Sequence, residues 1–301
     1  MGPELNGIHF MLPTPFADNG KVDVRPIPRL IKCAVNAGCK GVVALGIMGE
    51  AHRLSDTERT LLMNTVLDQA DGKLTVTLGV SAQSGHLAAE RTRDASNAGA
   101  SAVMACPASL GKPNPAATFA YFADIEESTD IPIVMQDLPL ETGVFLDPVF
   151  IAQLNEKLPH AKYLKLEDPP TPPKVTRVLE ATQGRIGVFG GLGGTFLFEE
   201  LRRGAIGTMT GFAYPEVLVN VHRCIEKGMV EQAREIFYRW LPLIRYENQT
   251  GIGLSIRKHI MHFRGLLDSP AVREPTPKTD QATLNELQDI LGAMNLEKKG
   301  T

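Results

Sequence analysis

The sequence predicts a single α/β domain: a (β/α)8 barrel, or TIM barrel, over residues 1–227, followed by a C-terminal helical extension over residues 228–301. Eight short apolar runs alternate with longer amphipathic segments, and successive runs begin about 20 to 35 residues apart, which is typical of this barrel. The runs are rich in Val, Ile and Thr, as expected for parallel strands that are buried on both faces. They cover residues 7–12, 41–46, 74–80, 101–106, 131–136, 162–167, 185–190 and 205–210.

Helix start signals stand between these runs. Ser55 and Glu58 form a capping box at the start of one helix, and Asp147 followed by Pro148 opens another. A third helix opens at Pro26. Further helices are expected at 84–98, 115–128, 173–182, 195–203 and 216–227, and in the extension at 229–246, 252–266 and 279–293.

A doubly wound open sheet is the competing architecture. It requires a Gly-rich GxGxxG turn after the first strand, and residues 12–20 read LPTPFADNG instead. The pattern therefore favours the barrel.

Composition limits the classes of partner. The chain has 43% hydrophobic residues, 22% charged residues and a formal net charge of -3, so no basic excess indicates a nucleic acid or a membrane surface. The first five residues contain no signal-peptide pattern, and no apolar stretch approaches the roughly 20 residues of a spanning helix, so we expect a cytoplasmic protein. No cysteine has metal-ligand spacing, and we expect reduced thiols and no metal or organic cofactor. The four cysteines are Cys33, Cys39, Cys106 and Cys224.

The segment KYLKLEDPPTP (162–172) is the most informative for chemistry. Strand alternation places Tyr163, Lys165 and Glu167 on one face, which we expect to point into the barrel. A buried ammonium is costly, and a neutral amine is a nucleophile that condenses with a carbonyl carbon to give an imine. The alternative is a structural ion pair of Lys165 with Glu167 or Asp168.

Two glycine-containing turns are candidate ligand-binding loops. After the second strand, Gly46 precedes Ile47 and Met48, whose backbone amides could hold a carboxylate. After the seventh strand, Gly190 and Gly191 stand before a helix, where barrels often place an anion. Each turn could equally be an ordinary connection between a strand and a helix.

These three stretches together resemble the dihydrodipicolinate synthase and N-acetylneuraminate lyase family of class I aldolases. The resemblance covers nearly the whole chain, from PTPFADNGKVD through GIMGEAHRLSDTER, IPIVMQDLPLETGV and YLKLEDPPTP to VFGGLGG and GAIGTMTG. It implies a homotetramer of (β/α)8 barrels with three added C-terminal helices. It also implies that Lys165 is the Schiff-base lysine and that the substrate is pyruvate or another 2-oxo acid.

The sequence departs from the family pattern at four places. Ile47 replaces a hydroxyl residue, and Gln136 stands where the family has a proton-shuttling tyrosine. Ser109 lies in the segment CPASLG, where synthases carry a Tyr-Tyr pair. Glu141 occupies the position of the arginine that holds a dicarboxylate aldehyde, so it should repel that substrate. These changes argue against efficient dihydrodipicolinate synthesis.

Two hypotheses of function follow. In the first, the protein is a Schiff-base lyase with Lys165 as nucleophile, Gln136 beside the imine and Glu141 and Ser109 near the second substrate. Replacement acids are available at Asp137, Glu141, Glu167 and Glu50. In the second, the loss of hydroxyls at Ile47 and Gln136 leaves a non-catalytic ligand-binding barrel that serves as a sensor or regulatory subunit.

Overall fold

A computed structural model describes residues 4–296, in which eight parallel strands close into a barrel, β1 pairing with both β2 and β8. The predicted fold class is confirmed. The strands are β1 Gly7–Met11, β2 Gly41–Ala44, β3 Thr75–Gly79, β4 Ala102–Ala105, β5 Ile133–Asp137, β6 Tyr163–Leu166, β7 Gly187–Gly190 and β8 Gly207–Thr210.

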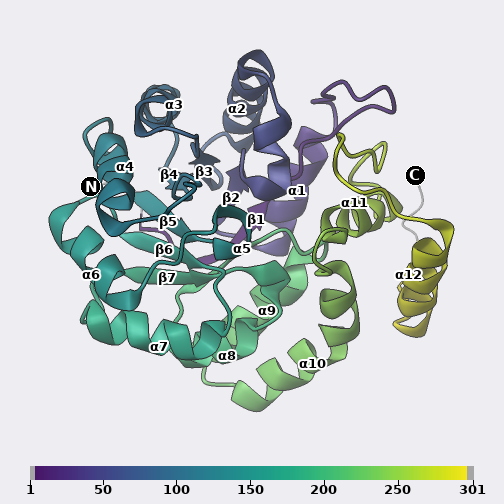
Figure 1. Cartoon of the computed structure of the whole chain (residues 1–301). Helices are drawn as coiled ribbons and strands as arrows, with labels where there is room; N and C mark the ends of the chain where they lie inside the picture. The colour runs from purple at the N-terminus through teal and green to yellow at the C-terminus, as the bar shows by residue number, and fades with distance from the viewer. Residues whose placement is uncertain (1–3, 297–301) are drawn as a thin grey trace.

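Helices surround the barrel as an outer ring, apart from a short one at Pro139–Thr142 (α5), which lies over the barrel mouth (Figure 1). Those of the barrel are α1 Ile27–Ala37, α2 Asp56–Ala70, α3 Gly85–Asn97, α4 Pro115–Glu126, α5 Pro139–Thr142, α6 Pro148–Lys157, α7 Thr171–Ala181, α8 Leu197–Arg202 and α9 Pro215–Glu226. The C-terminal extension contains α10 Val230–Glu247, α11 Gly253–Phe263 and α12 Gln281–Ala293, and α12 lies outermost (Figure 1). No helix within residues 4–296 is long and apolar enough to cross a membrane.

The predicted helix caps form as expected. Ser55 accepts a hydrogen bond from the amide of Glu58, and the Glu58 carboxylate accepts one from the amide of Ser55, which completes the capping box of α2. Asp147 caps α6 by accepting from the amide of Val149 at 2.8 Å. These polar side chains satisfy amides that a helix start leaves without intrahelical partners.

Two connections differ from the prediction. The helix expected from residue 195 begins at Leu197, because Leu192–Gly194 (η3) forms a 3-10 turn in which Gly193 adopts a φ of 66°. A short helix, α5, follows β5 where no helix was predicted, and Gly143 ends it in the left-handed conformation. Both connections lie at the carboxyl ends of strands, where they form part of the rim.

Strand register places Lys165 in the barrel interior. It lies beside Gln136 of β5 and Phe189 of β7. Leu164 and Leu166 are fully buried on the outer face of β6, as the alternation predicted. The rings of His9 and Phe189 pack against each other, with their centroids 5.2 Å apart. Burial lowers the pKa of His9 to about 4, so this ring is neutral at pH 7.

A buried ion pair joins the extension to the barrel. Lys258 of α11 donates to Glu50 at 2.7 Å, and both side chains are fully buried. The second oxygen of Glu50 accepts from the amide of Arg273 at 2.9 Å and from the hydroxyl of Thr276 at 3.2 Å. Glu50 is therefore occupied in holding the extension against the loop after β2.

Removing Lys258 tests how far the fold depends on this pair. We expect Lys258→Met to lower the free energy of unfolding by about 3–5 kcal/mol, because Glu50 is left as a buried carboxylate without its cation. Adding Glu50→Gln should recover part of that loss, since the uncompensated charge is removed. Chemical denaturation measures both changes.

Lys278→Met is the matched control. Lys278 pairs with Glu274 at 3.2 Å on the surface, and its loss should cost less than about 1 kcal/mol. A Lys258→Met variant as stable as this control would contradict the anchoring role.

Candidate active site

A cavity of about 290 Å³ opens at the carboxyl ends of the strands. Its floor includes Lys165, Gln136, Met11 and Met209, which come from four different strands. Active sites of (β/α)8 enzymes lie at this end of the barrel because the loops that vary are attached there.

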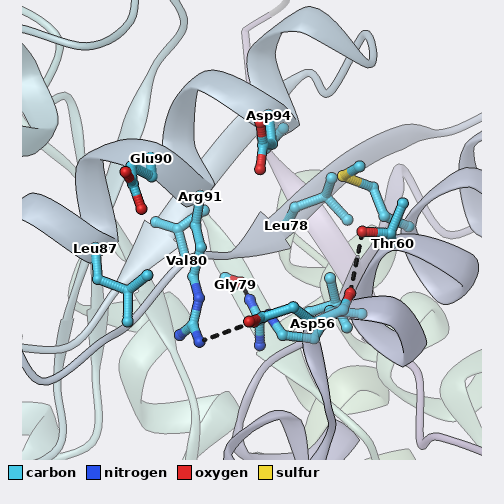
Figure 2. A pocket seen from close by; sticks show the side chains of 13 residues that line it. Asp56, Thr60, Leu78, Gly79, Val80, Leu87, Glu90, Arg91 and Asp94 are labelled. Atoms are coloured by element: carbon cyan, nitrogen blue, oxygen red, sulfur yellow. Dashed lines mark hydrogen bonds and ion pairs between the residues drawn. The ribbon is translucent and has the colours of Figure 1, made fainter.

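A second cavity, of about 250 Å³, lies between α2 and α3 on the outside of the barrel (Figure 2). Figure 2 shows Arg91 of α3 reaching toward Asp56 of α2, with an Nη2–Oδ1 distance of 3.6 Å. None of the predicted site residues is among the described residues that line this cavity. We therefore place the candidate active site inside the barrel mouth.

Lys165 lies buried at the floor of the mouth. Its side chain is 2% exposed, and its Nζ lies 2.9 Å from Oε2 of Glu167 and 3.1 Å from the thioether sulfur of Met11. The ion pair with Glu167 that the structural alternative predicted is thus present. Because Lys165 also lines the cavity, the pair lies where a ligand can reach it.

Glu167 is held by three groups. Besides the contact with Lys165, its Oε2 accepts from Nε2 of Gln136 at 2.6 Å, and its Oε1 accepts from the amide of Leu192 at 3.2 Å. The other end of the Gln136 amide accepts from the thiol of Cys106 at 3.1 Å. Burial raises the pKa of Cys106 to about 12, so the thiol keeps its proton and remains a donor. Gln136 therefore orients Glu167.

The loop after β2 presents the start of a 3-10 turn to the cavity. In η1, Ile47–Gly49, the amides of Gly49 and Glu50 donate to the carbonyls of Gly46 and Ile47. The amides of Ile47 and Met48 stand at the N-terminal end, where a helical turn offers no internal acceptor. A Cβ on Gly46 would lie 2.8 Å from the terminal methyl of Met11, the end of a flexible side chain that can shift.

Gly190 and Gly191 make room for carboxyl side chains of the protein itself. A Cβ on Gly190 would collide with Glu200, and a Cβ on Gly191 would collide with Glu167. The neighbouring Leu192 and Gly193 line the cavity. Burial raises the pKa of Glu200 to about 7, so this carboxyl beneath the loop after β7 is largely protonated in weak acid.

The other predicted candidates are distributed over several places. Glu141 lines the main cavity and also an adjoining cavity of about 400 Å³, and Ser109 lines the adjoining cavity. Asp137 faces away from Lys165 and binds Lys174 at 2.6 Å, as does Asp168. Burial raises the pKa of Asp137 to about 6.

His52 lines both cavities, and burial lowers its pKa. Glu50 is engaged by Lys258. Among the cysteines, Cys39, Cys106 and Cys224 are buried and form no disulfide, and Cys33 is partly exposed.

The C-terminal extension contributes one wall of the cavity, which the sequence did not predict. Glu247 ends α10, Asn248 follows it, and Arg257 lies on α11; all three line the cavity with Lys165. Arg257 binds Glu247 with an Nε–Oε1 distance of 2.6 Å. Nothing in the local sequence marks these residues, because only the packing of α10 and α11 against the barrel brings them to the mouth.

The fold and the cavity define a (β/α)8-barrel protein with a buried lysine beneath an open mouth. The family model described as the dihydrodipicolinate synthetase family matches residues 4–294, so the chain belongs to this family of lyases and aldolases. The resemblance noted in the sequence is confirmed.

Relatives within this group differ in reaction. The chain is 30% identical over 292 residues to L-2-keto-3-deoxyarabonate dehydratase of Azospirillum brasilense, covering 96% of this chain and 94% of the relative. It is 28% identical over 295 residues to 4-hydroxy-tetrahydrodipicolinate synthase of Methanopyrus kandleri, covering 96% and 98%. Among solved structures, dihydrodipicolinate synthase from Rhodopseudomonas palustris superposes with a TM-score of 0.91 at 35% identity, covering 97% of this chain and 98% of the other.

Proposed function

We propose that this protein is a Schiff-base-forming lyase that acts on pyruvate or a related 2-oxo acid. The observation that carries the proposal is the position of Lys165, whose buried Nζ lies at the floor of the cavity within 2.9 Å of a carboxylate. A lysine can act as a nucleophile only when it is unprotonated, and a carboxylate in contact with it can take the proton.

The first half of the reaction forms the imine. The Nζ lone pair of Lys165 attacks C2 of the 2-oxo acid, and the carbonyl oxygen takes a proton to give a carbinolamine. This hydroxyl takes a second proton and leaves as water when the nitrogen lone pair forms the C=N bond. Glu167 is placed to carry these protons, because its Oε2 contacts the reacting nitrogen.

The second half uses the protonated imine to accept electrons. Glu167 takes a proton from C3, the C–H electron pair forms a C2=C3 bond, and the C=N pair returns to nitrogen, giving an enamine. The enamine can add to an aldehyde, whose oxygen then takes the proton, or it can expel the C4 hydroxyl, which takes the proton and leaves as water. In either course water then hydrolyses the imine and frees the amine of Lys165. No metal or organic cofactor is needed for either course. Glu167 thus supplies the acid–base group that the replacement of the family tyrosine by Gln136 had removed.

Two features select the substrate. The amides of Ile47 and Met48 are placed to bind the carboxylate of the 2-oxo acid. Glu141, on the rim, is unfavourable for an aldehyde that carries a carboxylate. The part of the substrate beyond the 2-oxo acid is therefore proposed to differ from that of the synthases. A dehydration, the reaction in the name of the Azospirillum relative, is compatible with the same imine. Assembly as a cytoplasmic homotetramer belongs to this proposal and rests on family membership.

Reductive trapping tests the nucleophile. Incubation with pyruvate and borohydride should attach a reduced pyruvyl group to Lys165, as located by peptide mass spectrometry, and the Lys165→Met variant should stay unmodified. Peptides that contain Lys174 and Lys258, which are also buried, are internal controls. If neither pyruvate nor a panel of longer 2-oxo acids labels Lys165, the lyase is excluded and the non-catalytic binding barrel takes its place.

Glu167→Gln tests the proton carrier. The amide keeps the size and hydrogen-bonding shape of the carboxylate but cannot carry a proton, so the rate of imine formation should fall by about 100-fold or more. Rapid-mix trapping with borohydride measures that rate.

Asp168→Asn is the matched control, since Asp168 is the adjacent carboxylate and binds Lys174 instead of Lys165. Equal rates for Glu167→Gln and Asp168→Asn would show that the proton travels by another group.

A further inference from the structure

Lys165 differs from the other buried lysines in the atoms that its side-chain nitrogen contacts. Among the described residues, Lys165, Lys174 and Lys258 are the buried lysines. Nζ of Lys174 donates to two carboxylates, each at 2.6 Å. Nζ of Lys258 donates to a carboxylate at 2.7 Å and to a backbone carbonyl at 2.9 Å. Each of these two ammonium groups therefore has two oxygen acceptors, which stabilise its charge in the interior.

Lys165 has one oxygen acceptor and one sulfur acceptor. Within the part of the chain that the structure describes, its Nζ contacts Oε2 of Glu167 at 2.9 Å and the thioether sulfur of Met11 at 3.1 Å. Thioether sulfur is a weak hydrogen-bond acceptor, so it stabilises an ammonium group less than an oxygen atom would. Sulfur thus occupies the place that a second oxygen acceptor has at Lys174 and Lys258.

The packing of the barrel interior accommodates Met11 beside this nitrogen. Met11 comes from β1, which is not a neighbour of β6, so its side chain reaches across the interior to Lys165. The side chain is 3% exposed. A Cβ on Gly46 would lie 2.8 Å from its terminal methyl. The glycine therefore leaves room for the methyl, while the sulfur contacts Nζ.

We propose that Met11 is a further catalytic residue, whose thioether favours the neutral, nucleophilic form of Lys165 because it is a poorer acceptor than oxygen. When a proton passes from Nζ to Oε2 of Glu167, the N–H electron pair remains on nitrogen as the lone pair that attacks C2. An oxygen acceptor at residue 11 would stabilise the ammonium and oppose this transfer. The inference rests on the proposed function, since it explains how a lysine in contact with a carboxylate becomes a nucleophile.

Other titratable and charged groups also surround this site. Cys106 donates to Gln136, which lies beside Lys165. The remaining ones line the cavity and are His52, Arg53, Glu141, Glu167, Glu247 and Arg257. These groups are the same in the wild type and in variants of residue 11, so a difference between the proteins reports on the acceptor at residue 11.

Replacement of the sulfur by oxygen tests the inference. Met11→Gln keeps a side chain of similar length and offers an amide oxygen to Nζ. The rate of imine formation with pyruvate at pH 7 should therefore fall by about 10-fold, the worth of a hydrogen bond to a charged group. This deficit should narrow as the pH rises, because the ammonium then loses its proton to solvent in both proteins. Rapid-mix trapping with borohydride over a range of pH measures the rate.

Three further variants separate the acceptor from other effects. Met11→Leu removes the sulfur without adding an oxygen, so its rate should be at least that of the wild type. Met11→Ser admits water to the vacated space beside Nζ and should act in the same direction as Met11→Gln, without the bulk of the longer amide. Met209→Gln is the matched control, because it places the same amide in the same cavity from β8 and should keep the pH dependence of the wild type.

Competitive acetylation with acetic anhydride measures the protonation of Lys165 without pyruvate. The neutral amine is the form that reacts, so peptide mass spectrometry over a range of pH follows its fraction. The exposed Lys278 is the internal reference. In Met11→Gln the labelling curve of Lys165 should move to higher pH by about one unit, which corresponds to the same 10-fold change.

A deficit in Met11→Gln that is equal at every pH, or an equal deficit in Met11→Leu or Met209→Gln, would overturn the inference and leave the lyase intact. An unshifted labelling curve would overturn it as well. Absence of pyruvate trapping in the wild type would instead overturn the proposed function, and the labelling curve would still decide whether Met11 sets the charge of Lys165.

Discussion

The site depends on the burial of one ammonium group inside a closed barrel. Lys165 is almost completely buried there, so a charge on it must be balanced by a neighbour. Glu167 provides that balance from the end of the same strand, two residues further on and on the same face. The surrounding groups follow from this contact, because Gln136 and the Leu192 amide orient Glu167, and Gly191 leaves space for its side chain.

Two further buried ion pairs hold the helical extension at the mouth of the barrel. Glu50 from the barrel is paired by Lys258 of α11, and Arg257, one residue earlier, turns to Glu247 and the cavity. Adjacent residues on one helix thus serve two purposes: one fastens the extension to the loop after β2, and the other supplies a wall of the site. A displacement of α11 would disturb both the anchor and the wall.

Much of this arrangement was predictable from local patterns. Apolar runs and caps located the strands and several helix starts, and the alternation in residues 162–167 placed Lys165 inward. The start of the helix after β7 was harder to predict, because Gly193 adopts a left-handed conformation and the helix begins only at Leu197. The ion-pair partners of the carboxylates were harder still to predict. Asp137 and Asp168 both bind Lys174, and the spacing of residues along the sequence does not reveal these pairs. Arg257 was missed entirely, since its place at the mouth depends on packing between segments far apart in the chain.

A crystal structure of the protein soaked with pyruvate addresses the central claim most directly. The account predicts continuous electron density from Nζ of Lys165 to C2 of the ligand, with Glu167 still within hydrogen-bond distance of that nitrogen. The ligand carboxylate should lie against the amides of Ile47 and Met48. Pyruvate bound in the cavity with no bond to Lys165, and with the Lys165–Glu167 ion pair undisturbed, would contradict it.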